Sequence, residues 1–175
     1  MTAKIRPLGI LVLLVGAWGA LVPFVGPLFG YNMGNLAAWT WSESHFSLHL
    51  LPGAVAAVGG LLMLRSAAAR VRTGAILGLL GGAWFILGPT FHPAWAGGSG
   101  TMMMGSNVWS GILSSFGYHY GPGVVLTVLS AFALGALNSQ ARSMERRPPV
   151  TSQYEQTKQT SQDMAASDRD HASVT

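Results

Sequence analysis

Four histidines and a run of methionines are the residues of this sequence best suited to bind a metal ion. His45, His49, His92 and His119 all lie near the ends of apolar stretches. Glu43 lies close to the first of them, and the run consists of Met102, Met103 and Met104. Imidazole, carboxylate and thioether groups together are ligands for copper or another transition metal, and thioether favours Cu(I). The chain has no cysteine, which excludes disulfides, thiolate zinc sites and Fe-S clusters.

His49 and His119 allow two other interpretations. His49 opens the sequence HLLPG and His119 opens HYGPG, so the two side chains are expected at similar depths, as the two axial ligands of a haem must be. Alternatively, each imidazole bonds a backbone carbonyl that the following proline leaves without a donor. The sequence favours this last interpretation. We therefore predict no cofactor, with copper or haem as the alternative.

The sequence contains no recognisable catalytic arrangement. Glu43 is the only carboxylate predicted on the outer side, and no carboxylate or cysteine falls within a predicted span. The serines and histidines lack the context of a nucleophile elbow or an HExxH zinc motif. We expect a protein that is not an enzyme and has no catalytic residues.

The composition is that of an integral membrane protein. Half of the 175 residues are hydrophobic and only 9% are charged, against roughly a quarter in soluble domains. Apolar runs near the length of about 20 residues that a spanning helix needs predict an all-α, four-helix membrane bundle. The predicted spans are Pro7 to about Gly26, about His45 to Leu64, about Gly74 to Phe91, and about Tyr118 to Leu137. The lipid bilayer is thus a partner, and nucleic acid is not, because the basic residues flank the apolar runs.

Basic residues also predict the orientation. Lys and Arg are absent from the loops 27–44 and 92–117 but present before the first span, between the second and third, and after the fourth. The positive-inside rule then places both termini in the cytoplasm of a multi-pass plasma-membrane protein, with the four histidines outside. A cleaved leader ending near Ala17-Trp18-Gly19 is the competing interpretation, but the apolar stretch runs well past that point.

Two segments of the chain resemble each other. ILVLLVGAWGALVP at 10–23 and ILGLLGGAWFILGP at 76–89 share Gly-Ala-Trp and the closing proline, and each is followed by one of the HxxPG sequences. We predict two parallel helical-hairpin repeats in tandem, at 1–66 and 67–141, followed by a disordered cytoplasmic tail at 142–175. At GAWxxLxP the chain resembles the small bacterial SPW-repeat membrane proteins, although LVPFVGP and LGPTF replace Ser-Pro-Trp. The resemblance covers the four spans and implies an integral membrane protein with no catalytic residues to carry over.

Small residues predict how the helices pack. Gly74, Gly78 and Gly82 make two successive GxxxG steps, a face along which a helix of the same chain or of another copy can approach closely. The second span is expected to begin near His45, with Ser42 or Ser44 as N-cap and Pro52 inside the helix. The function we expect is association with itself or with other membrane proteins, and an outward-facing copper or haem site is the alternative.

Overall fold

The computed structural model describes residues 5–31, 37–96, 108–146, 154–155, 157–162 and 164. The chain divides into two units, Met1–Leu137 and Asn138–Thr175. Every regular element among the described residues is a helix, which agrees with the predicted all-α class. The predicted Met102, Met103 and Met104 ligands lie outside the described residues.

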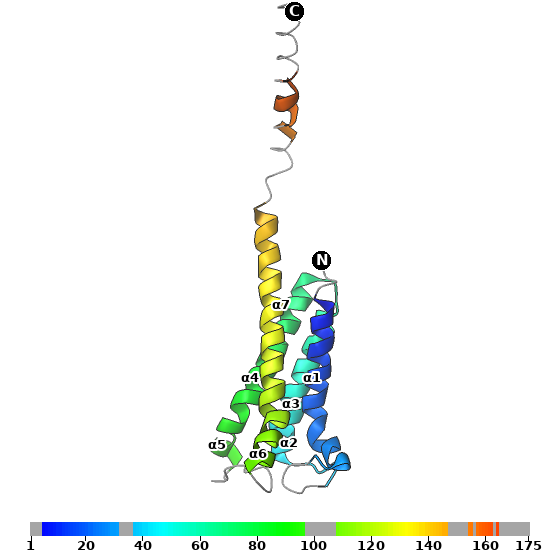
Figure 1. The fold of residues 1–175 in the computed structure, drawn as a ribbon, viewed down its shortest axis with the longest axis vertical. Helices are drawn as coiled ribbons and strands as arrows, with labels where there is room; N and C mark the ends of the chain where they lie inside the picture. The colour runs from blue at the N-terminus through cyan, green and yellow to red at the C-terminus, as the bar shows by residue number, and fades with distance from the viewer. Residues whose placement is uncertain are drawn as a thin grey trace, which may run out of the picture. The chain divides into compact units, whose positions relative to one another are not determined.

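Four stretches of helix are long and apolar enough to cross a membrane, as the sequence predicts (Figure 1). They are Arg6–Phe29, Glu43–Met63, Ala68–Phe91 and Gly111–Glu145. The first joins α1 (Arg6–Val25) to a 3-10 turn, η2 (Gly26–Phe29), and the third is the single helix α4 (Ala68–Phe91). The second joins α2 (Glu43–His45), η3 (Phe46–Leu50) and α3 (Leu51–Met63). The fourth includes most of α6 (Val108–Ser115), then η4 (Phe116–Tyr120) and α7 (Gly121–Glu145).

The second span begins where the sequence predicts. Ser42 is the N-cap of α2, and its hydroxyl accepts a hydrogen bond from the His45 backbone N–H at 3.1 Å. The helix then continues without a break through Pro52 to Met63. The predicted outer loops are partly helical, since η2 and α2 overlap the first and α5 (Pro93–Ala96) and α6 lie within the second. Helix α7 continues to Glu145, beyond the predicted end of the second repeat, and the tandem-repeat architecture itself stays a prediction.

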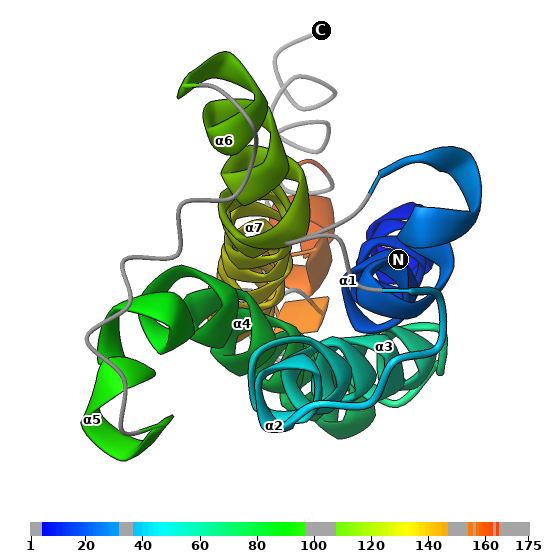
Figure 2. The ribbon, with the colours of Figure 1, turned by 90° about the horizontal axis from the view of Figure 1, so that it is seen from below.

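Glycine allows the helices to pack closely. Seen along the bundle, α3 lies between α1 and α4, and α7 closes the far side (Figure 2). A Cβ on Gly16 of α1 would lie 2.6 Å from the Ala57 nitrogen of α3, and one on Gly59 of α3 would lie 2.5 Å from the Gly74 carbonyl of α4. The bundle can form with this spacing only because these positions carry no side chain.

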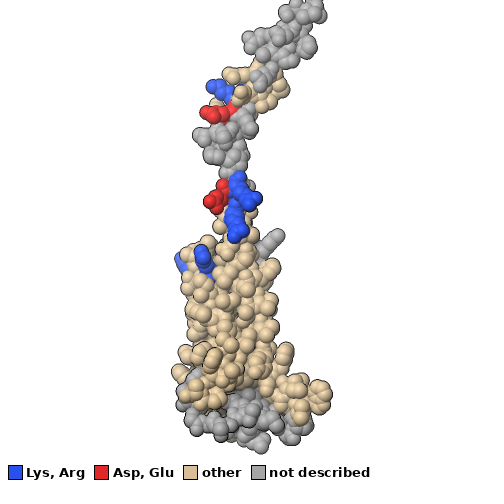
Figure 3. Space-filling model, turned by 90° about the vertical axis from the view of Figure 1, so that its left-hand side faces the viewer, with Lys and Arg blue, Asp and Glu red and all other residues tan. Residues whose placement is uncertain are grey.

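Apolar residues fill the half of the bundle where α1 begins and α3 ends. A cluster of buried side chains there includes Ile5, Met63, Val71 and Ala75. The basic side chains of the first unit that are visible in Figure 3 gather at the same end. The opposite end holds α2, η3, η4 and the C-terminus of α4, and we refer to it as the histidine end.

A π turn precedes Pro52 and another precedes Pro122. In η3 the Leu51 N–H bonds the Phe46 carbonyl five residues back, and in η4 the Gly121 N–H bonds the Phe116 carbonyl in the same way. A proline ring inside an α-helix would clash with the carbonyl four residues before it. The wider turn relieves this clash, so both helices continue through a proline, and each π turn contains a histidine.

Candidate functional site

All four histidines of the predicted outer cluster are buried at the histidine end. Their exposed fractions are 3% for His45, 1% for His49, 8% for His92 and 1% for His119. Histidine is usually only partly buried, and a buried imidazole normally has hydrogen-bond partners for its ring nitrogens. The partners of each ring therefore show what the cluster can do.

His49 and His119 face each other and lack such partners. His49 lies in η3 and His119 in η4, and their ring centres are 4.5 Å apart with an angle of 29° between the planes. All four ring nitrogens are buried and none has a hydrogen-bond partner. The carbonyl of Gly19 in α1 faces His49 without completing a hydrogen bond.

Aromatic rings enclose this pair. The ring centre of His49 lies 6.2 Å from that of Phe85 and 5.8 Å from that of Tyr118, which meets it edge-on. The Tyr118 hydroxyl donates to the Tyr31 carbonyl at 2.6 Å, so it is directed away from the imidazoles. Tyr31 stacks on Tyr118 with ring centres 4.7 Å apart, and burial raises the pKa of the Tyr31 phenol above its usual value. The pair therefore lies in surroundings of low polarity.

His45 is held by backbone groups next to the pair. Its Nδ1 lies 2.8 Å from the Thr40 carbonyl oxygen, and because a carbonyl only accepts, Nδ1 carries the proton and Nε2 the lone pair of the neutral ring. The His45 ring centre is 6.3 Å from that of His49 and 5.7 Å from that of Phe24. This arrangement, one nitrogen fixed by a carbonyl and the other free, is typical of histidines that bind metals.

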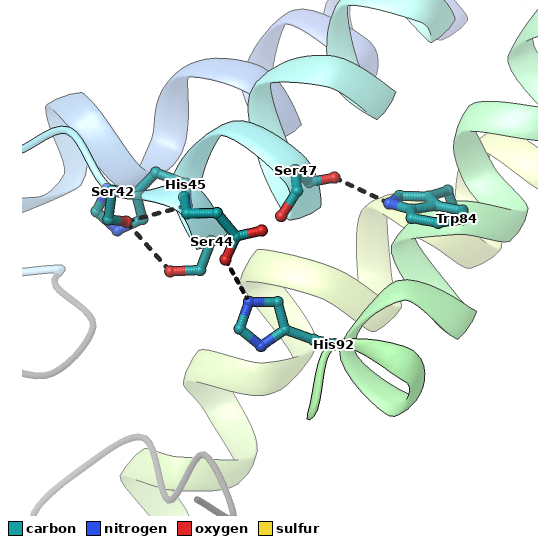
Figure 4. Close-up of polar contacts among 7 residues, drawn as sticks. Ser42, Ser44, His45, Ser47, Trp84 and His92 are labelled. Carbon is teal, nitrogen blue, oxygen red and sulfur yellow. Dashed lines mark hydrogen bonds and ion pairs between the residues drawn. The ribbon is translucent and has the colours of Figure 1, made fainter. Parts of the chain in front are cut away.

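His92 forms a separate contact. Its Nε2 lies 3.2 Å from a carboxylate oxygen of Glu43, which joins the end of α4 to the start of α2 (Figure 4). The Glu43 side chain is more than half exposed, so its carboxylate is open to solvent and this contact contributes little to stability.

The structure brings together three of the predicted ligands, His45, His49 and His119, in a chain of ring contacts. Within the described ranges, however, no group of three or more His, Asp or Glu residues is placed to hold a metal ion. A haem between His49 and His119 does not fit this arrangement, because axial ligands lie on opposite faces of the macrocycle and these rings stack directly on each other.

The structure does not place His49 against a carbonyl freed by proline. The Ser47 carbonyl lies five residues before Pro52, so in the π turn it is the acceptor that the proline leaves without a donor. It accepts instead from the indole N–H of Trp84, at 2.9 Å (Figure 4). The sequence gives no sign of this role for Trp84, nor of the Thr40 carbonyl that orients His45. The Trp84 contact joins two helices far apart in the sequence, and the Thr40 contact depends on the path of the backbone between Thr40 and His45.

The predicted packing glycines lie away from the histidines, in contacts within the chain. Gly74 faces Gly59 of α3, Gly78 faces Ser130 of α7, and a Cβ on Gly82 would lie 2.7 Å from the Thr127 hydroxyl oxygen. This side of α4 is therefore covered by α3 and α7 and is not a free surface for a second copy.

In comparisons with known proteins, the chain matches no family model, no curated protein and no solved structure.

Proposed function

We propose that this protein is a non-enzymatic, multi-pass plasma-membrane protein that binds a transition-metal ion, copper or zinc, at His49 and His119 on the outer side. The observation that carries the proposal is the contact between these two buried rings, whose four nitrogens have no hydrogen-bond partner. Leaving a buried polar group unpaired costs about 1–3 kcal/mol, so a chain that keeps two such rings gains from a ligand that pairs them.

A metal ion is the ligand that suits this pair. Neutral imidazole is a good ligand for zinc, copper and nickel. The positive ion also gives the buried nitrogen lone pair an electrostatic partner in place of the missing hydrogen-bond donor. With metal–nitrogen bonds of about 2.0–2.1 Å and an angle of about 90–110° at the metal, two imidazole centres lie roughly 4.5–5.2 Å apart. The observed 4.5 Å falls at the lower end of this range, and the two rings, which are 29° from parallel, would turn so that one nitrogen of each points at the same ion.

The distribution of polar groups supports binding rather than passage across the membrane. Beyond the histidines, Thr127 and Ser130 of α7 carry buried hydroxyls without partners along the contact with α4. Past Ser130 the described core is apolar, with Ala133, Ala75 and Val71 fully or almost fully buried. An ion held at the histidine end therefore has no polar path onward through the described core.

The orientation is part of the proposal. The segments that form the histidine end border the two loops without Lys or Arg, and the positive-inside rule places such loops outside the cytoplasm. Association with itself or with other membrane proteins, the first expectation from the sequence, would have to use a surface other than the glycine side of α4. None of the observed contacts favours such a surface.

Elemental analysis of the full chain tests the proposal. The protein is purified in detergent without chelators, and a metal-free sample is also titrated with Cu²⁺ and Zn²⁺. We expect about one bound ion per chain, lost when His49→Leu and His119→Leu are combined. His171→Ala, a change to the one histidine of the sequence outside the cluster of four, is the matched control and should leave binding intact. A wild-type chain that is metal-free and takes up neither ion overturns the proposal.

A further inference from the structure

An open groove lies on the surface of the bundle between α3 and α4. It has a volume of about 180 Å³ and is lined by residues of both helices: Leu51, Pro52, Val55, Leu80, Gly81 and Trp84. The groove is open to the surroundings of the bundle, since Leu51 and Leu80 are about half exposed. The indole N–H of Trp84 is engaged by the Ser47 carbonyl, so the groove offers a ligand an almost wholly apolar surface.

The contact between α3 and α4 continues from this groove to the basic end of the bundle. Arg70, Leu77 and Trp84 are spaced by seven residues, so they lie on one side of α4, with a drift of only about 20° per step. This side borders α3, since a Cβ on Gly59 would lie 3.2 Å from the Leu77 Cβ. Arg65 follows two residues after the end of α3. Arg65 and Arg70 therefore stand at the basic end of the seam that leads to the groove.

These two arginines have no acidic partner in the first unit. Glu43 is the only carboxylate side chain in residues 1–144, and it lies at the histidine end against His92. Arg65 and Arg70 are both exposed. A guanidinium can bind a phosphate through two parallel hydrogen bonds, and basic sites between spanning helices bind the headgroups of anionic lipids. The charge at this end of the seam therefore suits a phosphate group.

We infer that the seam between α3 and α4 binds one anionic phospholipid. Its phosphate lies against Arg65 and Arg70, and one acyl chain follows the seam into the groove. The lengths agree, because Arg70 and Leu80 are ten residues apart, about 15 Å along α4, and half of a hydrocarbon core of about 30 Å is also about 15 Å. The groove thus lies where an acyl chain from the leaflet at the basic end terminates. The site is separate from the histidine pair and does not require a bound metal ion.

Counting lipids bound to the full chain tests this inference. Lipid-free protein in detergent is titrated with phosphatidylglycerol or with phosphatidylcholine of the same acyl chains, and bound lipid is measured by native mass spectrometry. We expect one tightly bound phosphatidylglycerol and much weaker binding of phosphatidylcholine. Combining Arg65→Gln with Arg70→Gln should weaken phosphatidylglycerol binding by about 30-fold, which corresponds to roughly 1 kcal/mol for each arginine. Arg72→Gln is the matched control and should leave binding unchanged, because Arg72 lies about 200° around α4 from Arg70.

A second measurement follows the acyl chain. Phosphatidylglycerol with bromine atoms near the ends of its chains quenches the fluorescence of a tryptophan that it touches. With one equivalent of this lipid in detergent, we expect quenching in the wild type that is lost in Trp84→Phe and kept in Trp18→Phe. The two tryptophans are matched in exposure, at 39% for Trp84 and 43% for Trp18, but Trp18 belongs to α1.

Each measurement can overturn the inference. Equal affinity for the two lipids would show that the arginines select no headgroup. Glycerol phosphate that displaces phosphatidylglycerol at equal concentration would show that the groove contributes nothing to binding. Quenching that persists in Trp84→Phe would place the acyl chain elsewhere on the bundle. The quenching experiment uses no arginine variant, so it decides the matter even if the double variant does not fold.

Discussion

The indole N–H of Trp84 in α4 is bonded to the carbonyl oxygen of Ser47 in η3, at 2.9 Å. In the π register of η3 the next donor for this carbonyl would be the backbone of residue 52, but Pro52 has no N–H. A side chain from the neighbouring helix therefore replaces a backbone donor that the sequence removes. The proline is tolerated through a contact between helices as well as through the wider turn.

Replacing Trp84 with Phe should destabilise the bundle by about 1–3 kcal/mol, because the Ser47 carbonyl loses its donor while the apolar part of the ring remains. Reversible unfolding in mixed detergent, followed by circular dichroism, measures the change. Trp18, the equivalent tryptophan of the predicted repeat, stacks on Phe29. Trp18→Phe is the matched control and should have the smaller effect; equal losses would show that bulk, and not the hydrogen bond, matters at Trp84.

Replacing His49 and His119 together with Leu should stabilise the metal-free protein. Leucine is similar in size and removes ring nitrogens that are buried without partners, each of which costs about 1–3 kcal/mol. The same variant should bind no metal. Thermal unfolding of the metal-free wild type and variant measures the difference. A lower melting temperature in the variant would indicate that the imidazoles are structural, with Gly19 as the acceptor for His49.

Replacing Gly82 with Ala should disrupt the contact of α4 with α7. The added Cβ would lie 2.8 Å from the Thr127 nitrogen and 2.9 Å from the Gly123 carbonyl oxygen, and such overpacking costs about 1–3 kcal/mol. Gly135→Ala is the control, since a Cβ there meets nothing within 4 Å and alanine favours helix by about 0.5–1 kcal/mol. Unfolding should separate the two variants, and a Gly82→Ala protein as stable as Gly135→Ala would show that the contact is looser than observed.

The orientation can be measured by labelling single cysteines, because the natural chain has none. Trp41→Cys, at an exposed position of the histidine end, should react with a membrane-impermeant maleimide on intact cells. Ser66→Cys, exposed between α3 and α4, should react only after the cells are permeabilised. The reverse pattern would place the histidine end in the cytoplasm.

Much of the fold follows from the sequence alone. The length and hydropathy of the apolar runs predict the four spans, and of the two predicted N-cap candidates, Ser42 and Ser44, the structure uses Ser42. The short helices α5 and α6 are missed, because four to eight residues in a loop give too weak a periodic signal. The fourth span also begins earlier than predicted, at Gly111.

The site is less predictable than the fold. The sequence places His45, His49 and His119 at one end of the bundle, but the stacking of two rings depends on how η3 and η4 meet across the bundle. The π turns are missed because a proline within a helix can be accommodated by a kink, a break or a wider turn, and residue type does not decide among them. The residue type does not show which backbone carbonyl will accept a hydrogen bond from a side chain, as the Thr40 carbonyl does from His45.

The π turns make the position of the histidines depend on chain length as well as on residue type. Each wider turn amounts to one residue inserted into an α-helix. Deleting one residue from Phe46–Leu50 would restore a regular helix and rotate everything on its far side by about 100° around the axis. A related chain that is shorter by this one residue could retain the HxxPG sequence while its residue equivalent to His45 points away from the histidine pair. In such a family a one-residue gap would therefore change the site as much as a substitution does.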